Sequence, residues 1–146
     1  MRRGAAPGLL LTVLLAAPAP LAAQESTLTQ ARMQIYAGPL YRDYLGCLTC
    51  GQYEVSSVWN GYGPYGWDNV YPDHSHFARY RAPQGRYSAC DRFAAEPPIL
   101  IDTSGKNYGR LNVSTTRSDS ICGPHGAQGI CQTLTAMCKR TAETSP

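Results

Sequence analysis

Two short motifs contain the residue types that most often bind metals or carry redox chemistry. The first, Cys47-Leu-Thr-Cys50, is a C-x-x-C motif, which occurs in redox-active pairs, zinc sites and structural disulfides. A redox pair usually opens a helix, and a zinc site needs a second close pair of ligands. Here the motif follows a strand-like stretch and the other cysteines are widely spaced. We therefore predict structural disulfides among all six cysteines, without choosing the pairing: Cys47, Cys50, Cys90, Cys122, Cys131 and Cys138.

The second motif is the pair His74 and His76. On an extended segment both side chains would project to the same face, because side-chain direction repeats every two residues. With Asp73 or His125 they could supply three zinc ligands and leave a position open for water, as a hydrolase requires. The alternative is a solvated loop with two surface histidines, which Pro72 and the polar neighbours favour. Because H-x-H alone is a weak signal, we predict no metal or cofactor and keep a metal-dependent hydrolase as the alternative function.

Motifs for other catalytic chemistries are missing from the sequence. It has no G-x-S-x-G nucleophile motif, no phosphate-binding P-loop and no H-E-x-x-H helix. We therefore predict no catalytic residues.

Aromatic side chains are the remaining group that could carry a function. Ten of them lie between Tyr53 and Phe93, where aliphatic residues are sparse. Flat rings with polar edges suit sugar faces and protein surfaces, but they could equally form the core of a chain poor in Leu and Ile. Our candidate binding residues are Tyr65, Trp67, Trp59 and Tyr62. We favour the first two, because the others belong to a repeated unit, described below, whose rings we expect to point inward.

Residues 1–23 have the pattern of a secretion signal. Two arginines precede the apolar stretch GLLLTVLLAAP, and small residues lead to a cleavage position near Ala23. Prolines interrupt the run, which is shorter than the roughly 20 apolar residues of a membrane span. The chain has 13 Lys+Arg and 10 Asp+Glu, and the leader contains two of the arginines and none of the acids. The mature chain is thus nearly neutral, which disfavours nucleic acid, and we expect a secreted or periplasmic protein without a membrane span.

Two β-hairpins and one helix are expected to position these residues. Residues 34–50 predict a hairpin around Gly38 and Pro39, and residues 98–113 predict a second around a Ser-Gly-Lys turn. Residues 126–140 place apolar side chains at helical intervals, with Cys131 and Cys138 on one face, where both could link the helix to the body.

The sequence also repeats itself on two scales. When the second hairpin is laid over the first, three identities fall in one register, which predicts duplication of a small β unit: Gly46 with Gly109, Leu48 with Leu111, and Ser57 with Ser120. A shorter unit occurs as SVWNGY, SHFARY and SACDRF. We expect its third and sixth residues to point inward as i, i+3 neighbours: Trp59, Phe77 and Cys90, and Tyr62, Tyr80 and Phe93.

The segments YLGCLTC, SVWNGYGPYG and SACDRFAAEPPILIDTSGKNYGRLNV resemble an uncharacterised family of exported bacterial proteins with LGxLxC and repeated SxxNxYGxYG motifs. The similarity covers residues 44–113. It departs from the family pattern at residues 67–86, and at Asp91, where the family has Asn. The resemblance implies secretion and a repeat-built domain, and it implies no activity and no binding residue.

Together these observations predict a single secreted domain, residues 24–146 with its core at 34–140. The predicted fold is α+β, mainly β: two related β-hairpins, an aromatic turn-rich middle and a C-terminal helix. Three disulfides would compensate for a lean core by about 2–4 kcal/mol each. For function we predict an exported, non-catalytic binding or structural module of the cell envelope or extracellular space, whose partner is an envelope carbohydrate or protein.

Overall fold

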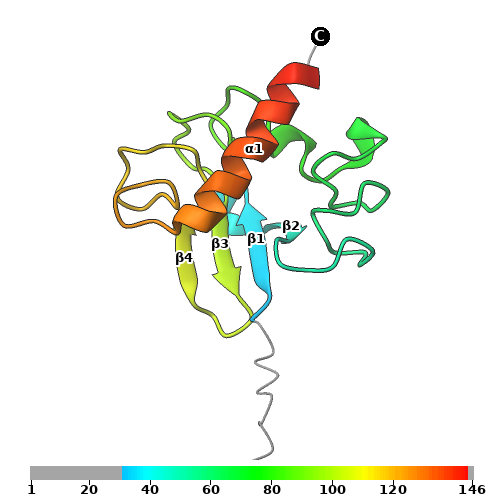
Figure 1. Cartoon of the computed structure of the whole chain (residues 1–146), viewed down its shortest axis with the longest axis horizontal. Helices are drawn as coiled ribbons and strands as arrows, with labels where there is room; N and C mark the ends of the chain where they lie inside the picture. Colours follow the sequence, from blue (N-terminus) through cyan, green and yellow to red (C-terminus); the bar gives the residue numbers. More distant parts are fainter. Residues whose placement is uncertain (1–30, 145–146) are drawn as a thin grey trace, which may run out of the picture.

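The computed structural model describes residues 31–144, and the predicted leader lies outside them. Strands β1 (Met33–Ala37), β2 (Asp43–Cys47), β3 (Ile99–Asp102) and β4 (Asn107–Arg110) form one antiparallel sheet in the order β2-β1-β3-β4. The helix α1 (Gln128–Thr144) crosses one face of this sheet, and long loops surround it (Figure 1). Short 3-10 turns are η1 (Pro39–Tyr41), η2 (Pro72–His74) and η3 (Ala78–Tyr80). The predicted α+β, mainly β fold is confirmed.

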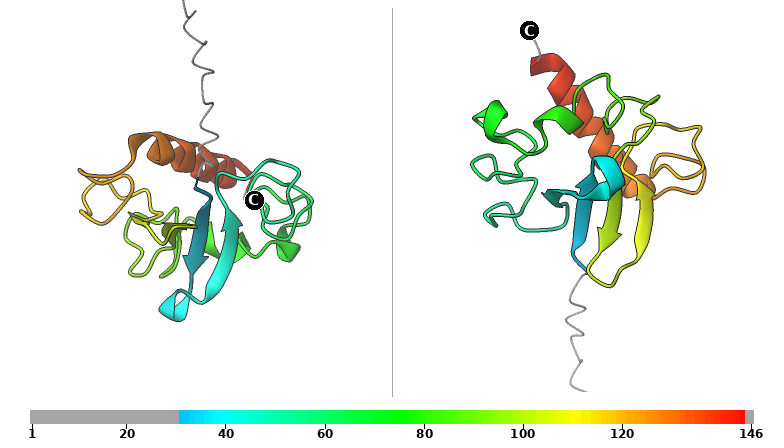
Figure 2. Two further views of the ribbon diagram at one scale, coloured as in Figure 1. Left: turned by 90° about the horizontal axis from the view of Figure 1, so that it is seen from below. Right: turned by 180° about the vertical axis from the view of Figure 1, so that it is seen from behind.

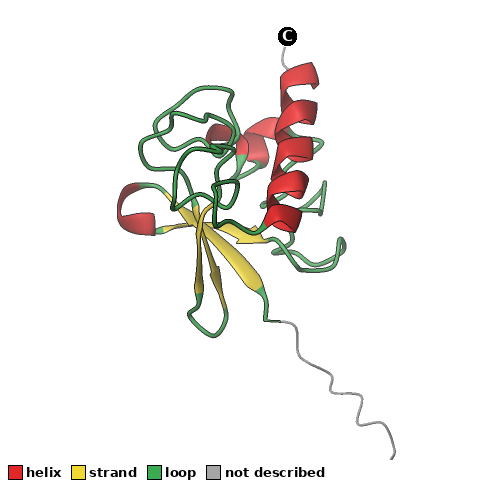
Figure 3. Ribbon diagram, turned by 60° about the vertical axis from the view of Figure 1, so that its left-hand side comes forward, coloured by secondary structure: helices red, strands yellow, loops and turns green. Residues whose placement is uncertain are grey.

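The core lies where the sheet, α1 and the loops meet, and Figure 3 shows these elements from another side. Alternation along β1 sends Ile35 and Ala37 to the helix side, and Leu100 pairs with Ile35 there. From α1, Leu134 and Met137 complete this cluster, since residues three apart share a helix face. The helix extends to Thr144, beyond its predicted end at residue 140.

Three disulfides join segments of this fold: Cys47–Cys50, Cys90–Cys138 and Cys122–Cys131. They include all six cysteines, which confirms that prediction. The second and third connect α1 to the loops at two places along its length, as the sequence predicted for Cys131 and Cys138. Near the C-terminal end of α1, the indole Nε1 of Trp67 also donates a hydrogen bond to Thr141 Oγ1 at 3.1 Å.

The two hairpins make the same set of backbone contacts in equivalent positions. Cys47 forms a parallel bridge with Ser57, and Arg110 forms one with Ser120. The hydrogen bonds of these bridges are equivalent. In the first hairpin Cys47 N–H donates to Ser56 O, and Val58 N–H donates to Cys47 O. In the second, Arg110 N–H donates to Asp119 O, and Ile121 N–H donates to Arg110 O. Both hairpins also shift register at the same place, beside glycines of positive φ, Gly46 and Gly109. The register found in the sequence therefore describes a shared local structure.

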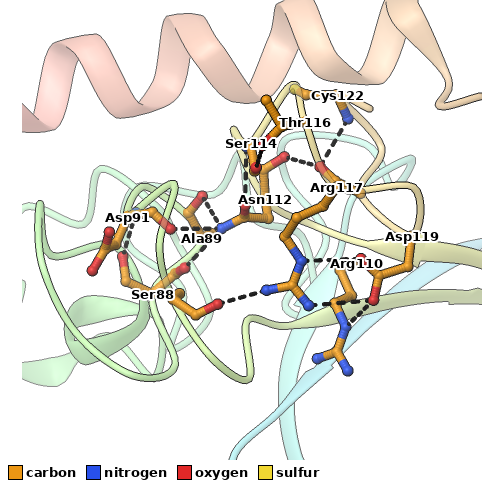
Figure 4. A network of polar contacts seen from close by, with 12 residues as sticks. Ser88, Ala89, Asp91, Arg110, Asn112, Ser114, Thr116, Arg117, Asp119 and Cys122 are labelled. Atoms are coloured by element: carbon orange, nitrogen blue, oxygen red, sulfur yellow. Dashed lines mark hydrogen bonds and ion pairs between the residues drawn. The ribbon is translucent and has the colours of Figure 1, made fainter. Parts of the chain in front are cut away.

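Serine and asparagine side chains hold the loops by binding backbone groups. In the short repeated unit, the hydroxyls of Ser57, Ser75 and Ser88 each accept the N–H two residues later and donate to an earlier carbonyl. The largest such network centres on the buried Asn112 (Figure 4). Its amide donates to the carbonyls of Ser88, Ala89 and Asp91, and its Oδ1 accepts the N–H of Ser114. These bonds give the buried N–H and C=O groups of the loops the hydrogen-bond partners that a helix or sheet would otherwise supply.

The turn between β1 and β2 is strained. Leu40 and Tyr41 both have left-handed backbone angles, with φ of 58° and 53°, which L residues other than Asn and Asp seldom adopt. The Tyr41 N–H bonds to Gly38 O, and the Tyr41 hydroxyl accepts a hydrogen bond from Arg110 at 2.7 Å. The Leu40 side chain, in contrast, is 78% exposed. The strained backbone is therefore held by its neighbours and not by burial of Leu40.

Candidate binding surface

The face of the sheet away from α1 carries aromatic, polar and aliphatic side chains. The right-hand view of Figure 2 shows this face from behind, with α1 on the far side. Tyr36 on β1 pairs directly with Tyr44 on β2 and with Ile99 on β3. Directly paired residues project to the same side of a sheet, so these three lie next to one another. All three are half-buried, whereas their neighbours Ile35 and Leu45 are buried on the opposite face.

From this face an unbroken row of four rings extends onto the loops beyond β2. Ring centroids are 5.4 Å apart for Tyr36 and Tyr44, 5.1 Å for Tyr44 and Tyr65, and 5.0 Å for Tyr65 and His76. These are ordinary distances for stacked or edge-to-face aromatic pairs. We call these four residues the aromatic row. Its three tyrosines are half-buried and His76 is exposed, so the row is a surface and not part of the core.

A glycine allows Tyr65 to lie against the sheet. Gly46 has φ of 114°, and a Cβ built there would lie 2.8 Å from Tyr65 Cβ and 2.9 Å from Ser56 O. Any larger residue would therefore push the Tyr65 loop away from β2. The next ring is held by the backbone, because His76 N–H donates to Pro64 O at 2.8 Å. The row thus depends on the strand, on Gly46 and on the loop that carries Tyr65.

A shallow cavity of about 310 Å³ lies along the row. Its lining combines rings and charges: Arg42, Asp43, Tyr44, Leu45, Tyr65, His76, Arg79 and Tyr80. Burial and then the hydrogen bond that its hydroxyl donates to Asp43 raise the pKa of Tyr80 to about 12. Burial also raises the pKa of Tyr44. Both phenols therefore remain protonated at neutral pH, and the cavity offers neutral hydroxyls beside charged groups.

The four predicted binding residues occupy different environments. Tyr65 lies in the aromatic row, as a surface role requires. Trp67, the other favoured candidate, is only 1% exposed and packs on Phe77 with ring centroids 4.6 Å apart. Trp59 is 37% exposed, and its indole donates to Leu48 O at 2.7 Å beside the start of α1. Tyr62 is 83% exposed but lies outside the row.

The prediction that the sixth residue of each short unit points inward is wrong in two cases. Tyr80 is buried, whereas Tyr62 and Phe93 are more than 80% exposed. The fourth residue of the unit explains the difference. Asn60 and Asp91 each accept, through Oδ1, the N–H of the sixth residue, which turns that side chain outward. Ala78 has no such acceptor, and the chain there forms η3, which carries Tyr80 into the core.

The second residue of the short unit was missed as an inward anchor. Val58 and Ala89 are fully buried, while His76, in the same position, is exposed and joins the aromatic row. Tyr36 and Tyr44 were also missed as surface residues. The signal was present in the sequence, because both alternate with the apolar residues of the predicted hairpin and so had to face away from the core.

The histidine pair does not gather a metal-binding set. His76 stacks on Tyr65, and the ring of His74 lies 5.6 Å from that of Tyr71. Both histidines border another shallow cavity together with Asp73, but His125 lies outside its lining. Within residues 31–144, no group of three His, Cys, Asp or Glu side chains is placed to hold a metal ion.

No protein-family model, curated protein or solved structure matches the chain. In the part that the structure describes, no helix combines the length and the apolar character that crossing a bilayer requires. Three disulfides fit a protein of an oxidising compartment. What the geometry offers for function is an aromatic surface beside a charged cavity.

Proposed function

We propose that this protein is an exported, non-catalytic binding module of the cell envelope or extracellular space, and that the aromatic row is its binding surface. The observation that carries the proposal is the row itself: four rings in continuous contact, which begin on the uncovered face of the sheet and continue onto the loops beyond β2. Rings that serve only as core are buried, as Trp67 is. Partly exposed rings that strand pairing and loop contacts fix in position are suited to stacking on a sugar or packing on a protein.

The leader and the disulfides support an extracellular location for this role. The leader predicts export, and the three disulfides would persist in the oxidising environment that export reaches. An envelope carbohydrate or an envelope protein is the expected partner. A binding role needs no catalytic group, and it requires a preorganised surface that matches its partner in shape and charge.

The proposal is tested by co-sedimentation of the mature, oxidised protein with an insoluble cell-envelope fraction. Tyr65→Ala and Tyr44→Ala should each weaken retention about tenfold, which is the effect of losing one well-placed ring. Tyr53→Ala is the matched control, because Tyr53 is 88% exposed and lies outside the row. Protease treatment of the fraction separates the two partner classes, since a carbohydrate partner survives it. Equal retention of all three variants and the wild type would refute the proposal.

A small metal-dependent hydrolase that uses His74 and His76 is the alternative proposal. The geometry of residues 31–144 adds no third ligand to this pair. Titration of the protein with Zn²⁺, with His74→Ala as the comparison, tests it directly. Stoichiometric binding that this substitution abolishes would favour the alternative.

A further inference from the structure

The cavity beside the aromatic row contains more positive than negative charge. Its lining includes two arginines, Arg42 and Arg79, and one acidic residue, Asp43. Within residues 31–144, Arg42 makes no ion pair. Arg79 reaches Asp43 only at 3.7 Å, and its side chain is 79% exposed. An exposed pair at this distance is weak and readily exchanged for a better partner.

The single carboxylate in the cavity is already engaged. Asp43 accepts a hydrogen bond from the buried Tyr80 hydroxyl, and Arg79 stands over the Tyr80 ring at 5.2 Å. Asp43 is thus tied to the body of the protein, while the two guanidinium groups present donors to solvent. Planar guanidinium groups bind carboxylates through paired hydrogen bonds. A carboxylate on a ligand could therefore accept hydrogen bonds from Arg42 and Arg79 in this cavity.

The position of the charges relative to the rings limits the kind of ligand. Tyr44, Tyr65 and His76 line the same cavity as the two arginines. A ligand that uses both features needs a flat apolar face for the rings and an anionic group at its edge. A neutral sugar would leave the guanidinium groups unused, and a simple anion would leave the rings unused. A sugar ring that bears a carboxylate has both.

We propose that the aromatic row and its arginines bind an acidic glycan, with uronate-type sugar rings on Tyr44 and Tyr65 and their carboxylates on Arg42 and Arg79. The proposal rests on the function proposed above and names its ligand class. Its two parts act separately: the rings supply contact area and the arginines supply selection for the charged form. Binding should weaken as salt is raised, because both guanidinium groups are solvent-accessible.

The test uses the mature, oxidised protein and three polymers: polygalacturonate, its fully methyl-esterified form, and inorganic polyphosphate. The ester keeps the sugar backbone and removes the charge, so polygalacturonate should bind about tenfold more tightly. The double variant Arg42→Gln/Arg79→Gln should lose this preference and retain the weak binding of the ester. Arg92→Gln is the control, because Arg92 lies over Phe93 at 4.9 Å and outside this cavity.

Three other results would each contradict binding of an acidic glycan. Equal binding of polygalacturonate and its ester, with Tyr65→Ala weakening both, would overturn the acidic ligand and leave the proposed binding surface standing. Polyphosphate that binds as tightly as polygalacturonate, and whose binding Tyr65→Ala does not affect, would show attraction to charge alone and overturn the proposal. No binding of either glycan would also overturn it, and the envelope co-sedimentation would then show separately whether the row binds a protein.

Discussion

Replacing Leu40 by glycine and by alanine should give stabilities in the reverse of their usual order. At an ordinary exposed position in a helix or strand, the glycine variant has a free energy of unfolding about 0.5–1 kcal/mol lower than the alanine variant, because glycine loses more backbone freedom on folding. Leu40 has φ of 58° and ψ of 22°. Both substitutions remove the same exposed side chain beyond Cβ, so their difference isolates the backbone conformation.

The magnitude follows from the cost of that conformation. A residue with a Cβ pays about 1–2 kcal/mol in the left-handed region, where the Cβ approaches the following carbonyl oxygen. Glycine avoids this cost but still loses its extra freedom, which leaves a difference of about 1 kcal/mol in its favour. For a domain of this length that corresponds to about 3–6 °C in Tm.

The assay is urea unfolding of both variants with the disulfides intact, followed by tryptophan fluorescence and by circular dichroism. Coincident curves from the two signals establish that the transition is two-state and that the comparison is valid. Leu40→Gly should have the higher free energy of unfolding. An alanine variant as stable as the glycine variant, or more stable, would refute the argument that the η1 turn is strained.

Three further predictions concern the groups that hold the fold together. The Ser104 hydroxyl and nearby N–H groups lower the pKa of Asp102 to about 2, against 3.8 for the free group. Because the folded pKa is the lower one, this stabilisation is present above about pH 4 and is lost as pH falls toward 2. The urea midpoint of Asp102→Asn should therefore depend less on pH in that range than that of the wild type. Removing Cys90–Cys138, whose residues are 48 apart in sequence, should cost about 4 kcal/mol, against about 1.5 kcal/mol for the C-x-x-C disulfide, by the entropy of the loops they close. Asn112→Ala should cost about 2–4 kcal/mol in chemical unfolding, because it leaves buried carbonyls and one N–H without their partner.

Much of the secondary structure could be predicted from local patterns. The two hairpins and the helix followed from alternation and helical spacing, which depend on near neighbours only. The cysteine pairing could not be predicted, because it depends on where the irregular loops that carry Cys90 and Cys122 come to lie against α1. Those loops are held by side chain to backbone hydrogen bonds, such as those of the serines, and these leave no periodic pattern in the sequence.

The candidate surface was predicted only in part for the same reason. Tyr65 was selected from the aromatic loop, but its partners Tyr36 and Tyr44 lie on the sheet, in a separate and earlier part of the sequence. The prediction of Trp67 as a surface ring is wrong. Its burial depends on Phe77 and on Thr141, which lies in the distant helix. Composition shows that aromatic residues are abundant, and only tertiary packing separates those of the surface from those of the core.

The related hairpins have a consequence for the number of ligands that one chain can hold. Ile35 of β1 pairs with Leu100 of β3 at the centre of the sheet. Within its own hairpin Ile35 pairs with Gly46, and Leu100 pairs in the same way with Gly109. The sheet therefore has an approximate two-fold axis at its centre. Beyond the shared part the two units diverge. The first continues to Tyr65 and the aromatic row, whereas the position of the second that corresponds to Tyr65 in the same register is Gln128, where α1 begins. Within residues 31–144 the proposed binding surface therefore has no second copy in spite of the internal symmetry, and avidity of that surface for a polymeric ligand would require several molecules side by side.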